Sequence, residues 1–422
     1  MLVDGRGDSG EGLYHQLFAY ELLDVVLVAG GREEVAARPE RYGLLEESSQ
    51  GSGHRVLLVS IMGNAVSRAR RVRRRFARAT VMSSASSMVT VMTDTPAPPI
   101  NVALDGFGEG DDPELAGALA FMIEQQGLLQ TLVAGIVELV PDTTRWRLTL
   151  TGDMISTVNR VTERADDNPY TTDRGAGYAG AITLPHDDGT FDIVISIEVL
   201  FATREDVGSV EALVAHVIAA AEHLSRHEAG HAALRLRGED ADAYQDVQGL
   251  SNSDAACRKP LAAHVDDNRI EQYTALHAPS PLHHVDHLTN EIAHLRAELN
   301  EAKRTWRADI GAAAYRTLTA ANGLVRMLAY LSPELGLDES GTPRRPDPLP
   351  DGWDEYVEDS WDAWSLTFHR LWPVDEPMTT NELGAVLADL CRLMNAWMRS
   401  IGVNWGLTDD DQEYIFWEKD RY

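Results

Sequence analysis

The 422-residue sequence is poor in cysteine and lysine, with two and three residues respectively. The two cysteines, Cys257 and Cys391, exclude a disulfide-rich scaffold and a zinc site made of cysteines alone. None of the lysines, Lys259, Lys303 and Lys419, follows the G-x-x-x-x-G stretch of a P-loop. Phosphate chemistry of that kind is therefore excluded.

Long hydrophobic runs are also lacking. No stretch of about 18 apolar residues occurs without a charge, so we expect no transmembrane helix and no membrane partner. Residues 1–12 are acidic and glycine-rich, which is the wrong chemistry for a signal peptide. We therefore expect a cytoplasmic protein.

Positive charge is scarce: 37 basic residues stand against 66 acidic ones, for a net charge of −29. Such a chain is a poor candidate for nucleic-acid binding, because phosphate contacts need basic surface. The exception is Arg68–Arg78, a segment dominated by arginine. We weigh a basic arm that binds nucleic acid or an acidic partner, a flexible tail, and an artefact upstream of a true start at Met82, Met88 or Met92.

From residue 112 onward the pattern is globular. Hydrophobic periodicity predicts helices at 113–140, 152–161 and 207–237, and again from residue 260 to the end. Alternation of apolar and polar residues predicts strands at 146–151, 178–184 and 191–200. Residues 238–258 are polar and are expected to form a loop.

The long helix at 207–237 carries an H-E-x-x-H motif, formed by His227, Glu228 and His231. Residues four apart share a helical face, so both imidazoles can reach one Zn²⁺ ion, and Glu228 can accept a proton from a water on that ion. Roughly 0.04 matches are expected by chance in a chain of this composition. A solvated helix face with two histidines is the alternative. Gly230 costs a helix about 1 kcal/mol relative to alanine, which predicts close packing around the site.

A zinc site of this type needs a third protein ligand. The extended motif of the metzincin family, H-E-x-x-H-x-x-G-x-x-H, is not present, because Leu234 and Arg237 occupy its glycine and third-histidine positions. Asp267 and Glu271, four residues apart on a later predicted helix, are the candidates. One of them can bind the metal while the other orients a ligand histidine. Spacing does not decide between them, although the longer side chain favours Glu271; an ordinary acidic helix face is the alternative.

Other polar residues are weaker candidates. Tyr244, His264 and Tyr273 are possible donors to an oxyanion. For a second histidine-rich group we favour a structural or incidental role. Its members are His277, His283, His284, Asp286, His287 and His294. Four tryptophans of the C-terminal third could line a binding surface, but a helical core is the better interpretation. They are Trp353, Trp361, Trp364 and Trp372.

The H-E-x-x-H helix, the strands before it and the acidic helix after it resemble the zincin metallopeptidases, in particular the gluzincin-like group with a carboxylate as third ligand. The resemblance covers about residues 146–273. It departs from the gluzincin pattern, where Glu precedes Asp by four residues, because here Asp267 precedes Glu271. The local string from His227 to Ala232 is also similar to FtsH-type proteases. By resemblance, Phe191–Leu200 would be the edge strand that pairs with a peptide substrate.

The fold class we expect is α+β, with a zincin-like lobe of a small mixed sheet plus a metal-binding helix, followed by a mostly helical C-terminal lobe. The expected divisions are a poorly structured or mis-annotated segment at 1–110, a zincin-like metallopeptidase domain at 111–280 and a helical domain at 281–422.

The function we predict is zinc-dependent hydrolysis of peptide bonds in a peptide or protein substrate. Glu228 is expected to be the general base, and His227, His231 and either Glu271 or Asp267 the metal ligands. The alternative is a catalytically inactive zincin-like protein with an interaction or structural role.

Overall fold

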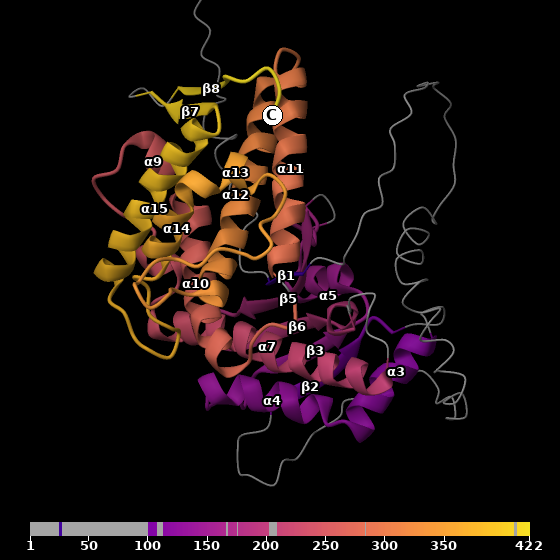
Figure 1. The fold of residues 1–422 in the computed structure, drawn as a ribbon. Helices are drawn as coiled ribbons and strands as arrows, with labels where there is room; N and C mark the ends of the chain where they lie inside the picture. The colour runs from indigo at the N-terminus through magenta and orange to yellow at the C-terminus, as the bar shows by residue number, and fades with distance from the viewer. Residues whose placement is uncertain are drawn as a thin grey trace, which may run out of the picture.

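The computed structural model describes residues 25–27, 100–107, 113–165, 168–174, 176–201, 209–282, 284–408 and 412–422. It is a mixed α+β structure with a small sheet and a mostly helical C-terminal part (Figure 1). The α+β class is thereby confirmed. The interpretations of Arg68–Arg78 fall outside the described residues.

Six strands form the main sheet: β1 Val25–Leu27, β2 Asn101–Asp105, β3 Arg147–Thr151, β4 Asp173–Arg174, β5 Gly177–Pro185 and β6 Phe191–Ser196. Their order is β1-β5-β6-β3-β2, and β4 pairs with β5. β2, β3 and β6 run parallel, whereas β5 is antiparallel to β1, β4 and β6. The strands predicted at 146–151 and 178–184 are confirmed.

One expectation about the sheet is wrong. Phe191–Leu200 is not an edge strand, since β6 is hydrogen-bonded to β5 on one side and β3 on the other. The strand also ends at Ser196. The Ser196 hydroxyl accepts a hydrogen bond from the backbone N–H of Glu198 and so caps the start of the short helix α6, Ile197–Leu200. Within the predicted N-terminal segment, β2 pairs in register with β3 and is part of the sheet.

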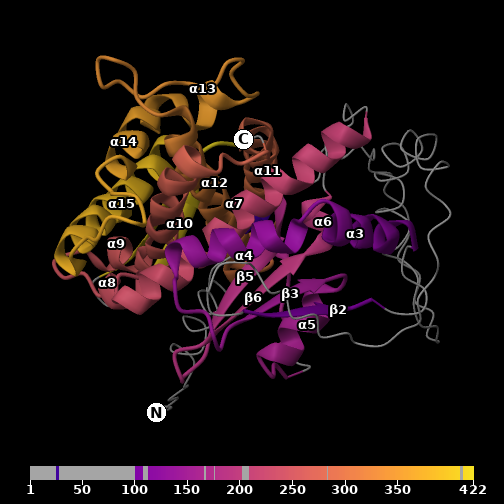
Figure 2. The same cartoon turned by 90° about the horizontal axis from the view of Figure 1, so that it is seen from below.

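Helices cover both faces of the sheet. The helices α3 Pro113–Gln125, α4 Leu128–Leu139 and α7 Val210–Arg237 pack on one face, and α5 Met154–Val161 packs on the other (Figure 2). Alternation along β6 explains the division, because Ile193 and Ile195 pack on the α7 side and Val194 packs on the α5 side. The helix predicted at 113–140 is two helices, broken at Gly127 with a φ of 72°.

The remaining helices are α8 Ala241–Tyr244, α9 Asn252–Ala256, α10 Arg258–His277, α11 His284–Thr305, α12 Ile310–Leu335, α13 Trp353–Tyr356, α14 Glu358–Phe368 and α15 Thr380–Ser400. A hairpin of β7 Val403–Leu407 and β8 Glu413–Trp417 follows them, where only helices were expected. Trp353, Trp361 and Trp364 are buried in the helical core, as the core interpretation predicted, whereas Trp372 is 46% exposed.

α10 contributes to two hydrophobic cores. Leu261 and Val265 pack into the core of the C-terminal helices, while Ile270 and Tyr273 pack into the core beneath the sheet. This helix is the element that joins the predicted lobes.

The two cores are also interleaved along the chain, because Tyr244 and Cys257 pack into the core of the C-terminal helices, whereas Leu282 and Val374 pack into the other one. The expected division at residue 280 stays a prediction.

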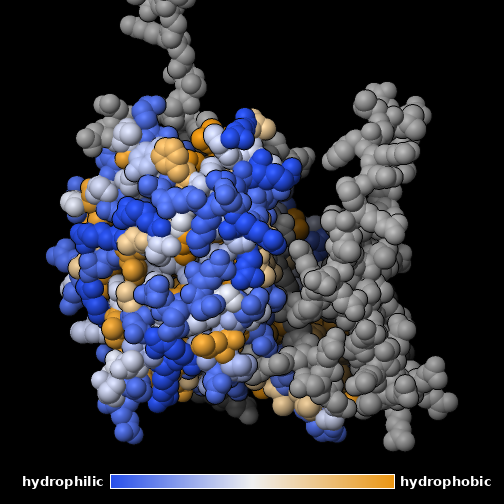
Figure 3. Space-filling model, turned by 45° about the horizontal axis from the view of Figure 1, so that its top comes forward, coloured by the Kyte–Doolittle hydropathy of each residue, from blue (hydrophilic) through white to orange (hydrophobic). Residues whose placement is uncertain are grey.

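The surface view shows the distribution of hydrophilic and hydrophobic residues on one face of the protein. On the face shown in Figure 3, hydrophilic side chains predominate and hydrophobic ones are scattered. Among the described residues, no single helix has the length and hydrophobicity to cross a membrane. One bent pair, Leu115–Gln125 with Leu128–Leu139, meets those two criteria with a bend of 67°.

A close contact fixes α7 against α10. A Cβ atom at Gly230 would lie 2.8 Å from Cγ1 of Ile270, which is closer than carbon atoms approach without repulsion. The glycine therefore allows α10 to approach α7 at this point. Close packing was the reason predicted for a glycine in this helix, and the structure identifies Ile270 as the neighbour.

We expect Gly230→Ala to destabilise the protein by about 1–2 kcal/mol, because overpacking outweighs the gain in helix propensity. Urea denaturation measures the change. Gly117→Ala on α3 is the matched control: no atom lies within 4 Å of its added Cβ, so it should stabilise by about 1 kcal/mol. In an Ile270→Ala background, Gly230→Ala should lose its cost; an unchanged cost there would contradict this packing argument.

Candidate metal centre

The H-E-x-x-H motif lies in the middle of α7, where the sequence predicted it. The Ser209 side chain caps the start of this helix by accepting a hydrogen bond from the backbone N–H of Ala212. Gly238, with a φ of 65°, ends the helix. His227 and His231 are buried, at 0% and 2% exposed. Their Nε2 atoms lie 3.2 Å apart, so both imidazoles point to one place.

Asp267 of α10 completes this group. Its Oδ1 lies 3.5 Å from Nε2 of His231 and 4.0 Å from Nε2 of His227. Two ligands bound about 2.0–2.1 Å from one zinc ion at the tetrahedral angle lie roughly 3.3 Å apart. The three distances are close to that spacing, so His227, His231 and Asp267 could hold one cation between them.

Glu271 has a different position. Its Oε1 lies 2.7 Å from Nδ1 of His227, on the opposite side of the ring from Nε2. That distance is typical of an N–H···O hydrogen bond and is too short for two ligands of one zinc ion. Thr274 donates a hydrogen bond to the other carboxylate oxygen at 3.2 Å. The geometry therefore favours Asp267 as ligand and Glu271 as the group that orients His227, the reverse of the preference based on side-chain length.

The ionisation of the histidines suits metal binding. Burial lowers the pKa of His227 to about 3 and holds the pKa of His231 well below its usual value. Both imidazoles are therefore neutral near pH 7. Because Glu271 accepts from Nδ1 of His227, the lone pair of His227 is on Nε2, which faces the other candidate ligands.

The same groups pair with one another, with Nε2 of His231 3.5 Å from Oδ1 of Asp267, and their chemistry also suits a cation. If Nε2 of His231 carried a proton, it could donate to Nε2 of His227, but Nδ1 of His231 would then be a buried acceptor without a hydrogen-bond partner among the described residues. If Nδ1 of His231 carried the proton instead, the Nε2 lone pairs of His227 and His231 and the carboxylate of Asp267 would face one another without a proton between them. A divalent cation removes that repulsion, and two imidazoles with a carboxylate are ligands that Zn²⁺ accepts.

The side chain of Glu228 extends from α7 to β5 of the sheet. The hydroxyl of Thr183, on β5, lies 2.8 Å from Oε2 of Glu228 and 2.9 Å from its backbone oxygen. Oε1 has no hydrogen-bond partner among the described residues. Burial raises the pKa of Glu228 to about 8. The sheet thus fixes one carboxylate oxygen and leaves the other able to accept a proton.

Several residues around this centre were not predicted from the sequence. Tyr330 of α12 is buried and forms a side-chain hydrogen bond with Asp267. Thr183 and Thr274 contact the two glutamates as described above. No sequence signal identifies these three in advance. His223 is different, because it precedes His227 by four residues and so repeats the spacing of the motif.

The proposed oxyanion donors are engaged elsewhere. Tyr244 donates to Asp266 at 2.6 Å, and Tyr273 donates to Glu138 at 2.5 Å. His264 lies closer to the centre, with Nδ1 4.0 Å from Oδ2 of Asp267, while its Nε2 contacts Asn322 at 2.8 Å. Of the three, only His264 is beside a candidate ligand.

The second histidine-rich group reaches the edge of the candidate site through His284, whose stacking partner Tyr330 lies 6.1 Å from the His227 ring. His284 binds Glu334 through Nδ1 at 2.7 Å and stacks on Tyr330, while His277 stacks on Tyr273. His283 lies outside the described residues. Nothing in these contacts adds a ligand to the cation site.

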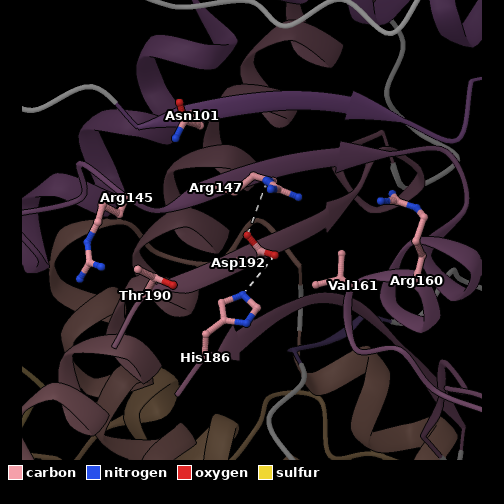
Figure 4. Close-up of a pocket in the computed structure, with 8 residues that line it drawn as sticks. All are labelled: Asn101, Arg145, Arg147, Arg160, Val161, His186, Thr190 and Asp192. Carbon is pink, nitrogen blue, oxygen red and sulfur yellow. Dashed lines mark ion pairs between the residues drawn. The ribbon is translucent and has the colours of Figure 1, made fainter. Parts of the chain in front are cut away.

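A pocket of about 350 Å³ opens elsewhere on the sheet (Figure 4). Its lining is Asn101, Arg145, Arg147, Arg160, Val161, His186, Thr190 and Asp192. Asp192 lies 3.8 Å from Arg147 and 3.2 Å from His186, and the other two arginines pair with Asp188 and Asp105. The positive charge is balanced locally, and none of the lining residues belongs to the candidate metal centre.

Comparison with known proteins gives no match: no family model matches the chain, and no similar curated protein or solved structure was found. The assignment of the site therefore rests on its own geometry.

We expect Asp267→Ala to weaken zinc binding by more than about 100-fold and Glu271→Ala by about 10–100-fold, because the second residue acts through His227. Competition with a chromogenic chelator measures both affinities. Asp246→Ala, an exposed acid outside the cluster, should change nothing. A larger loss for Glu271→Ala than for Asp267→Ala would reverse the two roles.

Proposed function

We propose that the protein is a zinc-dependent metallopeptidase. The observation that carries the proposal is the convergence of Nε2 of His227, Nε2 of His231 and Oδ1 of Asp267. Glu228 follows His227 directly in α7 and is near enough to Asp267 to interact with its charge. The resemblance of the motif to zincins supports the same function, with a zincin-like lobe formed by the sheet and α7. Its substrate would be a peptide or protein.

His227, His231 and Asp267 would hold the zinc ion. A bound zinc ion supplies Lewis-acid chemistry, since it makes water acidic near neutral pH and polarises a carbonyl group. Glu228 would act as general base through Oε1, because Oε2 is held by Thr183. Protonated Glu228 would then return the proton to the leaving amine.

The environment of Glu228 supports this role. With a pKa of about 8 the carboxyl group is protonated near pH 7, and a bound cation would favour the ionised form that a general base needs. Thr183 limits rotation of the carboxylate, so the accepting oxygen keeps its direction. Thr183 therefore positions the proposed base.

The burial of the site favours a second candidate function, a cation centre with a structural or interaction role and no catalysis. His227 and Glu228 are 0% exposed, and Asp267 and Glu271 are 3% and 4% exposed. A structural centre needs no access for substrate, whereas a peptidase must open. Stoichiometric zinc without hydrolysis of any peptide in a library would favour this second candidate.

The test of the peptidase is Glu228→Gln. The amide retains the shape and can still accept from Thr183, so zinc content should stay at one equivalent, while hydrolysis of library peptides should fall at least about 100-fold. Elemental analysis and mass spectrometry of digests measure the two quantities.

Glu222→Gln, an exposed glutamate on the same helix, serves as control and should cleave like the parent. If Glu228→Gln cleaves as fast as the parent, Glu228 is not the base and the mechanism is wrong.

A further inference from the structure

The floor of the pocket in Figure 4 is a polar row across three parallel strands. Asn101 of β2 pairs with Arg147 of β3, and Arg147 pairs with Asp192 of β6. Residues in register on parallel strands point to the same face of a sheet, and here it is the face that α5 covers, because Asp192 and Val194 are two residues apart on β6. α5 packs farther along the strands, against Val194, and leaves the polar row open.

Two further segments enclose this row. Arg160 and Val161 end α5, and His186 and Thr190 belong to the turn between β5 and β6. The enclosed volume of about 350 Å³ is near the lower end of the range for small-molecule sites. Of the described residues that line it, Val161 alone is apolar, and none is phenylalanine, tyrosine or tryptophan. A ligand would therefore be held by polar contacts and not by stacking.

Asp192 pairs with two basic groups of the lining. Its Oδ1 lies 3.8 Å from Nε of Arg147, and its Oδ2 lies 3.2 Å from Nε2 of His186. The residue is 7% exposed, and a carboxylate with so little exposure needs charged or polar partners in place of water. A separation of 3.8 Å is too long for a hydrogen bond, so this ion pair leaves the N–H groups of Arg147 available to a ligand.

The other arginines are held only by exposed ion pairs. In Figure 4, Arg147 and Arg160 extend toward each other from β3 and α5. Arg160 pairs with Asp105, and Arg145 pairs with Asp188 at 3.4 Å. The side chains of Arg160 and Arg145 are 58% and 68% exposed, and ion pairs so exposed contribute little to stability. A ligand with strong acceptor groups could therefore replace these acids at small cost.

We propose that this pocket binds the phosphate monoester group of a small molecule that also carries hydroxyl groups. A carboxylate has two oxygens and is matched by one guanidinium group, whereas the three terminal oxygens of a phosphate monoester can accept from Arg147 and Arg160 together. Asn101, Thr190 and Asp192 offer an amide, a hydroxyl and a carboxylate to the hydroxyl groups of the ligand.

The lining also narrows the class of phosphate ester. A nucleotide base usually binds against an aromatic or apolar surface, and the described lining provides only Val161 for that purpose. A phosphorylated polyol or sugar matches the polar lining better. The inference goes beyond the proposed peptidase and does not rest on the cation centre, because the lining contains none of the candidate ligands.

Isothermal titration calorimetry of the full chain tests the proposal with three probes at equal ionic strength. Glycerol 3-phosphate represents the ester, inorganic phosphate the bare group, and acetate a carboxylate. We expect glycerol 3-phosphate to bind at least about tenfold more tightly than acetate, because it uses a second guanidinium group. It should also bind more tightly than inorganic phosphate, because its hydroxyl groups add contacts.

The variants test the two facing arginines. Arg147→Gln and Arg160→Gln should each weaken binding of glycerol 3-phosphate about 10–100-fold, since each removes a charged donor pair. Arg147→Lys keeps the charge without the planar fork, so it should recover only part of the loss. Arg392→Gln on α15 is the matched control, because this arginine is 54% exposed, pairs with Asp389 and lies outside the pocket. It makes the same change in net charge and should leave affinity within about twofold.

No heat of binding from either phosphate probe at millimolar concentration would overturn the proposal. Affinity within about twofold of the parent for both Arg147→Gln and Arg160→Gln would also overturn it, because the ligand would then be held elsewhere. Acetate that binds as tightly as the ester would overturn the preference for phosphate, and inorganic phosphate that binds as tightly would overturn the hydroxyl contacts. Circular dichroism checks that each variant is folded, and if Arg147→Gln is not, Arg160→Gln decides.

Discussion

The contact between α7 and α10 is the constraint on which the candidate site depends. Gly230 lets Ile270 lie against the backbone of α7, so α10 approaches closely just where both helices carry polar residues. With so little space between the helices, a side chain as short as that of Asp267 reaches the two imidazoles. A residue of ordinary size at position 230 would hold the helices apart.

This spacing also explains the roles of the two carboxylates. Asp267 and Glu271 are one turn apart on α10, as His227 and His231 are on α7. The shorter acid meets the Nε2 atoms, and the longer one extends to Nδ1 of His227 from one turn farther along. Side-chain length alone suggested the opposite, because a longer arm seemed necessary to cross between helices. The answer depends on interhelical distance, which sequence spacing does not contain.

Hydrophobic periodicity in the sequence predicted most of the secondary structure around the site. The long apolar helix with its motif, the alternating strands and the acidic helix all occur close to their predicted bounds, because each signal is a periodicity within one element. Contacts between distant segments were not foreseeable in the same way. Thr183 reaches Glu228 only because β5 lies under α7, and Tyr330 reaches Asp267 only because α12 packs on α10.

The order of strands shows the same limit. A run such as Phe191–Ser196, buried at every position, is typical of a strand with neighbours on both sides, but which strands those are is decided by tertiary packing. The assignment of this run to the sheet edge followed the resemblance and not its burial pattern. Its apolar composition was the available sign that it belongs in the interior.

The electron-rich interior between α7 and α10 has a thermodynamic consequence. A ligand that binds the native chain and not the unfolded one adds RT ln(1 + [L]/Kd) to stability, about 2.7 kcal/mol at a concentration 100 times the dissociation constant. The two imidazoles and the carboxylate come together only in the native chain, so their ion would contribute to folding directly. If the proposed ion binds, the melting temperature of this protein will depend on the trace metals of the buffer as well as on the polypeptide.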